Sequence, residues 1–136
     1  MNSQKRLGVL IVDDNEMTRS VLRISLHGDE YEVLGEATNG RAGLDAALRL
    51  RPDIVCLDIV MPDMNGLDVL AAIKDALPGT AVLMVTASAD LATVKTAIGG
   101  GAAGFIVKPF NTITVHETMR KTAQAVLRQR AQARPA

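Results

Sequence analysis

Residues 52–66 read Pro52-Asp53-Ile54-Val55-Cys56-Leu57-Asp58-Ile59-Val60-Met61-Pro62-Asp63-Met64-Asn65-Gly66. The first half is a short run of aliphatic residues that ends at a carboxylate, Asp58. Uninterrupted runs of this kind are typical of strands that are buried on both faces of a parallel sheet. The second half contains proline and glycine, which mark a turn before the next element. This stretch therefore predicts a buried strand with an acidic residue at its carboxyl end.

Four similar aliphatic runs occur elsewhere, and an amphipathic segment follows each run. The expected strands are Leu7–Val12, Glu32–Ala37, Ile54–Leu57, Ala81–Val85 and Gly104–Val107. In the segments after them, apolar residues recur at the spacing of a helix with one buried face. The positions expected to be buried are Met17, Val21, Ile24, Leu44, Ala47, Leu48, Leu70, Ile73, Leu77, Leu91, Val94, Ile98, Val115, Met119 and Val126. This alternation predicts an α/β fold of the (βα)5 type, a doubly wound parallel sheet with helices on both faces.

Length and composition narrow the class of protein. The chain has 136 residues, the size of one domain, and we expect a domain at 1–128 with a basic flexible C-terminal tail at 129–136. Its formal net charge is zero and aromatic residues make up only 2% of it, which disfavours direct nucleic-acid binding and attraction to an anionic membrane. The apolar run near the N-terminus is too short for a signal peptide or a membrane span, so a cytoplasmic location is expected.

Polar residues gather where the expected strands end. Asp13 and Asp14 follow the first strand, Asp58 the third, Thr86 the fourth and Lys108 the fifth. In a doubly wound sheet, functional residues collect at the carboxyl ends of the strands. Three carboxylates on one rim repel one another, and a hard divalent cation such as magnesium relieves that repulsion. A carboxylate beside such an ion can attack phosphorus, while a lysine and a threonine stabilise the transferring group, so the set predicts phosphoryl transfer to a carboxylate.

Each of these residues has a simpler interpretation when it is taken alone. Asp13 and Asp14 could cap the first helix, because aspartate is a preferred N-cap residue. Asp58 could head the turn that follows it, and Thr86 could be a β-branched residue at a strand end. Lys108 could be a surface lysine before a turn. All five residues nevertheless fall on one rim of the predicted sheet, and this conjunction favours the functional interpretation.

Four stretches together match the pattern of a known family. They are Val9-Leu10-Ile11-Val12-Asp13-Asp14-Asn15-Glu16, residues 52–66, Val85-Thr86-Ala87 and Gly104-Phe105-Ile106-Val107-Lys108-Pro109-Phe110. On these stretches, and over about Leu7 to Val126, the chain resembles the response-regulator receiver domains of two-component signalling. The resemblance implies a flavodoxin-like, five-stranded sheet with the strand order 2-1-3-4-5.

The resemblance also implies a role for each matching residue. Asp58 would be the phosphoacceptor, and the ligands of Mg²⁺, for which Mn²⁺ can substitute, would be Asp13, Asp14, Asp58 and the backbone carbonyl of Val60. The residues that bind the phosphoryl group and switch with it would be Thr86, Ala87, Lys108 and Phe105. The peptide bond before Pro109 would be cis, and Val60 and Ser88 would tune the phosphoryl lifetime. Many relatives have tyrosine at the position of Phe105, so a readout that needs a phenolic hydroxyl is missing in this chain.

The implied function is that of a phosphorylation-activated receiver, a signalling phosphoacceptor that catalyses only its own phosphorylation and slow dephosphorylation. The implied phosphodonor is a sensor histidine kinase or a histidine phosphotransfer protein. The output would be the binding of a partner protein to the face formed by the fourth helix, the fifth strand and the fifth helix, with the receiver as a monomer or weak dimer. A stand-alone regulator is favoured, and the alternative is the excised receiver domain of a larger, for example DNA-binding, regulator.

Two other functions fit the sequence less well. A phosphatase with an aspartate nucleophile would carry that nucleophile after the first strand and a second acid two residues later, where this chain has Asn15. A degenerate receiver used only for docking would keep the fold without the chemistry, but all five rim residues are present.

Overall fold

The computed structural model of the chain describes residues 6–87 and 90–133. The elements are β1 Leu7–Val12, α1 Glu16–Ser25, β2 Tyr31–Ala37, α2 Gly40–Leu50, β3 Ile54–Asp58, α3 Gly66–Ala76, β4 Ala81–Thr86, α4 Leu91–Gly99, β5 Gly104–Val107 and α5 Thr112–Ala133. The expected alternation of strands and helices is confirmed. Ser88, to which the sequence assigned a role in phosphoryl lifetime, lies outside the described residues.

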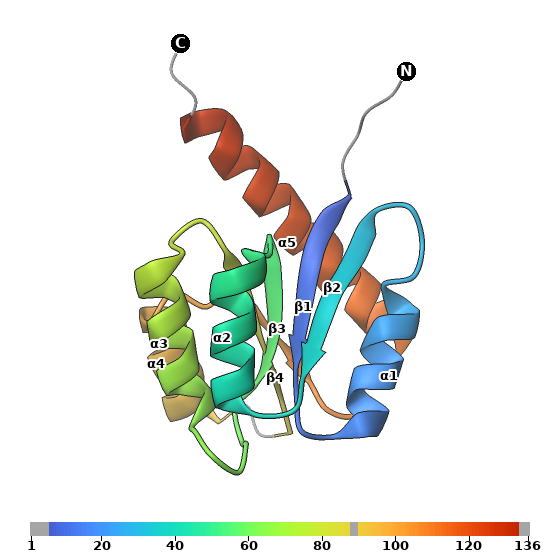
Figure 1. The fold of residues 1–136 in the computed structure, drawn as a ribbon. Helices are drawn as coiled ribbons and strands as arrows, with labels where there is room; N and C mark the ends of the chain where they lie inside the picture. Colours follow the sequence, from blue (N-terminus) through green and yellow to red (C-terminus); the bar gives the residue numbers. More distant parts are fainter. Residues whose placement is uncertain (1–5, 88–89, 134–136) are drawn as a thin grey trace.

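The five strands form one parallel sheet in the order β2-β1-β3-β4-β5 (Figure 1). This order confirms the flavodoxin-like topology. Successive strand residues face opposite sides, because Leu10 belongs to one buried cluster and its neighbour Ile11 to the other. Helices α2, α3 and α4 cover the first side, and α1 and α5 cover the second. The strand order reverses between β1 and β3, so their carboxyl ends lie next to each other at one edge of the sheet.

Asparagine and aspartate side chains define where four of the helices begin. Asn15, Asn39, Asn65 and Asp90 are the N-cap residues of α1, α2, α3 and α4, and each side chain accepts a hydrogen bond from a backbone amide in the first turn. Asn15, and neither of the two preceding aspartates, caps α1. The capping interpretation of Asp13 and Asp14 is therefore wrong.

The buried faces of three helices differ from the sequence prediction, and in α2 the difference is at Leu48, which is 46% exposed. In α1, Leu22 faces the sheet and is fully buried, whereas Met17 and Ile24 are largely exposed. The helix carries two apolar stripes, and the stripe through Leu22 and Leu26 packs on the second side of the sheet. In α4 the small Ala97 is buried, which leaves Leu91 and Ile98 exposed. Apolar spacing alone does not distinguish a stripe that packs on the sheet from one that faces solvent.

Helix α5 continues into the segment that the sequence predicted as a flexible tail. It runs to Ala133, and its last turns extend beyond the sheet (Figure 1). Arg130 in this part forms an ion pair with Asp53, which also accepts a hydrogen bond from the amide of Gly8 over 2.7 Å. Residues 129–133 therefore belong to α5, and the flexibility of the segment from residue 129 stays a prediction. Within the described ranges, every helix falls short of the length or the apolar character that crossing a bilayer requires.

Candidate functional site

Three carboxylates meet at the carboxyl ends of β1 and β3. Asp13, Asp14 and Asp58 each offer one oxygen, and these oxygens lie within 4.8 Å of one another. Asp13 and Asp58 are buried, and Asp14 is exposed. The meeting follows from the sheet order, because Val12 at the end of β1 pairs with Leu57 near the end of β3. The structure thus brings together the acidic residues that the sequence placed on one rim.

Asp13 is held in place by its own backbone and by a nearby arginine. Its amide donates to the carbonyl of Ala37 over 3.0 Å, and its Oδ1 accepts from the amide of Asn15 over 2.8 Å. The guanidinium of Arg19 donates to the Asp13 carbonyl over 2.8 Å and pairs with Glu36, with 3.3 Å between Nε and Oε1. Sequence reasoning missed Arg19 and Glu36, because their pairing joins α1 to β2 and leaves no local signal.

Burial and like charge weaken the acidity of Asp58. Burial raises its pKa to about 6, and the neighbouring Asp13 contributes in the same direction, while Lys108 and the amide of Val60 act against them. The Val60 amide lies 3.3 Å from Oδ1 of Asp58. At neutral pH the Asp58 side chain is therefore mostly ionised, although it is buried at the end of β3.

Lys108 brings the counter-charge to this cluster. Its ammonium nitrogen lies 3.1 Å from Oδ2 of Asp13 and 3.5 Å from Oδ2 of Asp58. The Lys108–Pro109 peptide bond is cis, as expected. Thr86 is buried at the end of β4, next to the strand that leads to Lys108, and Ala87 after it is exposed. Phe105 is half-buried in β5 and packs against the first core cluster.

The oxygen atoms of the cluster fit a hard divalent cation. Oδ2 of Asp13 is buried and has no hydrogen-bond partner among the described residues, although it forms the ion pair with Lys108. A buried carboxylate oxygen in this state is suited to a metal bond. The donors are all carboxylate oxygens, which magnesium prefers over nitrogen or sulfur. The residues present therefore fit the Mg²⁺ that the sequence predicted.

The loop after β3 runs directly beside the carboxylates. The Gly66 amide donates to the Ile59 carbonyl over 2.7 Å, and Val60 forms an isolated antiparallel bridge with Asn65. A Cβ atom at Gly66 would lie 2.2 Å from the carbonyl oxygen of Asp58, so only glycine fits there. Val60 is 74% exposed and takes no part in the core. This compact loop brings the Val60 backbone next to Asp58 without help from the Val60 side chain.

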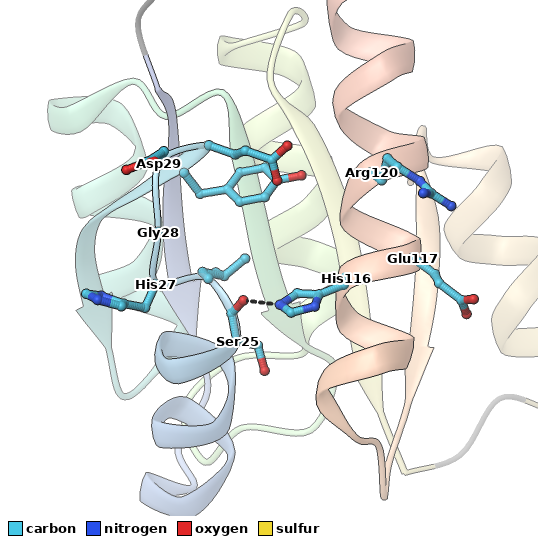
Figure 2. A pocket seen from close by; sticks show the side chains of 10 residues that line it. Ser25, His27, Gly28, Asp29, His116, Glu117 and Arg120 are labelled. Carbon is cyan, nitrogen blue, oxygen red and sulfur yellow. Dashed lines mark hydrogen bonds between the residues drawn. The ribbon is translucent and has the colours of Figure 1, made fainter.

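Two of the hollows outside the carboxylate cluster lie beside α1. One is a mostly apolar groove beside Lys108, lined by Met17, Thr18, Val21, Ala87, Pro109 and Phe110. The other is a pocket of about 390 Å³ between the end of α1 and α5, where Nε2 of His116 lies 2.6 Å from the carbonyl oxygen of Ser25 (Figure 2). The side chains of Glu117 and Arg120 point away from that contact in Figure 2. None of the predicted site residues lines this second pocket.

Comparisons with known proteins agree with this geometry. A family model described as the response regulator receiver domain matches residues 9–120. The chain is 42% identical to the chemotaxis protein CheY of Thermotoga maritima, over 85% of this chain and 97% of that protein. It is also 41% identical to a protein-glutamate methylesterase/protein-glutamine glutaminase of Pyrococcus horikoshii, over 82% of this chain but only 31% of that protein.

Solved structures show the same arrangement of elements. The crystal structure of a CheY-like response regulator receiver domain protein from Methanospirillum hungatei superimposes with a TM-score of 0.83. The two chains are 26% identical, and the match covers 92% of this chain and 99% of the other.

Proposed function

Because the chain belongs to the family of response regulator receiver domains, we propose that it is a phosphorylation-activated switch in which Asp58 accepts the phosphoryl group. The single observation that carries this proposal is the position of Asp58. It is buried, lies beside Asp13 and Asp14, and faces the ammonium of Lys108 at 3.5 Å. This arrangement supports the proposal, because it would combine a carboxylate nucleophile with a cation and with oxygen ligands for a divalent metal.

The proposed reaction is an in-line displacement at phosphorus. An Oδ atom of ionised Asp58 forms a bond to phosphorus while the bond to the donor breaks, and the donor leaves with the electron pair. Asp13, Asp14, Asp58 and the Val60 carbonyl would hold Mg²⁺ or Mn²⁺, whose charge would offset that of the phosphoryl oxygens. Lys108 would neutralise one of these oxygens, and the Thr86 hydroxyl and the Ala87 amide would donate hydrogen bonds to others.

The proposed output is a change in the surface formed by α4, β5 and α5. Phosphate on Asp58 would favour the arrangement in which Thr86 and Lys108 contact it, and Phe105 would turn inward as Thr86 moves. Exposed apolar residues of these elements support a docking role, among them Leu91 (70%), Ile98 (52%), Val107 (45%) and Ile113 (67%). A partner that buries them would sense the state of the switch. The receiver itself would be a monomer or weak dimer.

The proposed phosphodonor is a sensor histidine kinase or a histidine phosphotransfer protein, acting in the cytoplasm. Among the relatives, CheY proteins match over nearly their whole length, whereas the methylesterase matches over a third of its length. The first comparison supports a stand-alone regulator, and the second supports the alternative, a receiver domain within a larger protein. The size of the native protein on an immunoblot of its source cells distinguishes the two.

The experiment that tests the function is incubation with acetyl phosphate and MgCl₂, followed by intact-mass measurement. We expect a gain of one phosphoryl group in the wild type, loss of this gain in Asp58→Asn, and loss in the presence of EDTA. Asp68→Asn, which changes an exposed acid in the first turn of α3, is the matched control and should gain mass like the wild type. No gain in a folded wild-type protein would contradict the proposal.

A further inference from the structure

The carboxylate of Asp63 joins two segments that are far apart in the sequence. Its Oδ1 accepts from the amide of Gly40 over 2.8 Å, and its Oδ2 accepts from the amide of Arg41 over 2.9 Å. Asp63 belongs to the loop that follows β3, and the two amides are the first of α2. The bonds from Arg41 and Gly40 hold the pKa of Asp63 below its usual range, so the side chain is ionised at neutral pH.

Close packing reinforces this connection. A Cβ atom at Gly40 would lie 2.8 Å from Cβ of Met64 and 3.1 Å from a methyl group of Val69. The bare backbone at the start of α2 therefore rests against the residue next to Asp63. Helix α2 is itself anchored, because its buried Ala47 packs in the core on the first side of the sheet. The loop after β3 is thus tied to a fixed element at Asp63 and Met64.

The same loop carries Val60, whose backbone carbonyl is a proposed metal ligand. Because Val60 is 74% exposed, side-chain packing does little to hold this residue in place. Its backbone is held at one end by Asp58 in β3 and across the loop by the bridge to Asn65. Asp63 lies within this short loop and supplies its tie to α2.

We propose that Asp63 is a positioning residue for the metal site: by binding the start of α2, it holds the loop 59–65 so that the backbone of Val60, whose amide lies 3.3 Å from Oδ1 of Asp58, stays beside the carboxylate cluster. This inference rests on the proposed function, since it assumes that the cluster binds Mg²⁺. Asp63 itself contacts neither the metal nor the phosphoryl group in the proposed mechanism. Its effect is on metal affinity, through the geometry of one backbone ligand.

The test measures the Mg²⁺ dissociation constant of the wild type, Asp63→Ala and Asp63→Asn by calorimetric titration at pH 7.5. We expect Asp63→Ala to weaken Mg²⁺ binding roughly tenfold, the lower end of the effect of losing an outer-shell partner. Asp63→Asn keeps one acceptor oxygen and should fall between the two. Faster hydrogen exchange at the Gly40 and Arg41 amides in Asp63→Ala, seen in ¹H–¹⁵N spectra that also show an intact fold, would confirm that the tie is broken.

Asn39→Ala is the matched control. It removes another hydrogen bond at the same helix end, from the Ala42 amide to Asn39 Oδ1 over 2.8 Å, without touching the loop. It should leave the Mg²⁺ dissociation constant unchanged. Wild-type affinity in Asp63→Ala, or equal weakening in Asn39→Ala, would overturn the inference alone. Failure of the wild type to bind Mg²⁺ would overturn the proposed function and this inference with it.

Discussion

The backbone amide of Lys108 donates a hydrogen bond to the backbone carbonyl of Thr86 over 2.8 Å. The two residues proposed to contact the phosphoryl group are therefore linked through the main chain at the ends of neighbouring strands. A substitution of either side chain leaves this link in place. The effects of such substitutions consequently report on the side chains at the site and not on the pairing of β4 with β5.

Lys108→Ala should slow phosphorylation by acetyl phosphate about 100-fold, because it removes the cation that faces the transferring oxygens. It should also raise the pKa of Asp58, since the ammonium at 3.5 Å favours the ionised carboxylate. The rate is measured by intact mass against time, and the pKa by ¹³C NMR of the aspartate carboxyl groups. Lys121→Ala, at an exposed position of α5, serves as the control. An unchanged rate would remove Lys108 from the mechanism.

Asp58→Asn should stabilise the metal-free protein at pH 7.5 by about 1–3 kcal/mol. The pKa of Asp58 is about 6 in the folded protein and about 4 in the unfolded chain, so the folded state binds more protons between these values. The free energy of unfolding of the wild type therefore falls as the pH rises from about 4 to 6. The asparagine side chain of the variant carries no charge at any of these pH values, so the advantage of the variant should disappear near pH 4.

Urea unfolding with EDTA at pH 4 and pH 7.5 measures this difference. Asp75→Asn, which changes an exposed acid of α3, provides the control for loss of a surface charge. If the wild type and Asp58→Asn had equal free energies of unfolding at both pH values, ionisation of Asp58 would not destabilise the folded protein, and the prediction would be wrong.

Gly66→Ala should destabilise the protein by at least about 2 kcal/mol, because the new methyl group would press on the β3 backbone. The built Cβ lies 2.2 Å from the Asp58 carbonyl oxygen and 2.6 Å from Cα of Ile59, and neither can move as a side chain would. Gly79→Ala is the matched control, since nothing lies within 4 Å of a Cβ there. Urea unfolding of both variants checks the prediction, and similar small effects of the two would refute it.

Val60→Asn should shorten the lifetime of the phosphorylated protein. Val60 lies two residues after Asp58, its amide is 3.3 Å from Oδ1 of Asp58, and its exposed side chain is apolar, so it cannot orient a water molecule for attack on the acyl phosphate. An amide at this position can do so. The decay of the phosphorylated mass after removal of acetyl phosphate measures the effect, with Val60→Ala as the apolar control. Equal decay of all three proteins would exclude Val60 from control of the lifetime.

The sequence predicts the sheet and its acidic rim well, for a physical reason. Strands that are buried on both faces are continuous apolar runs, so β1 and β3 can be recognised from their own residues without knowledge of the strands that pair with them. Parallel strands then place Asp13 and Asp58 at the same edge. The order of the strands followed from the family resemblance, since local patterns do not specify which strands pair.

Other features depend on contacts between distant segments. The Asp63 carboxylate binds amides that lie 22 and 23 residues earlier, and nothing near Asp63 in the sequence indicates this. The exposed stripe of α1 through Met17 has the same spacing as a buried one. The helical end of α5 is held by Arg130 and Asp53, which are 77 residues apart. Local composition predicted a tail from residue 129, whereas α5 continues to Ala133.

The central claim, that Asp58 is the residue that carries the phosphoryl group, is tested most directly by borohydride reduction. Borohydride converts an acyl phosphate of aspartate to homoserine, and peptide mass spectrometry then locates the converted residue. After treatment with acetyl phosphate and Mg²⁺, we predict homoserine at position 58 and unmodified aspartate at positions 13 and 14. Homoserine at another aspartate, or at none in a protein that gained phosphoryl mass, would contradict the account.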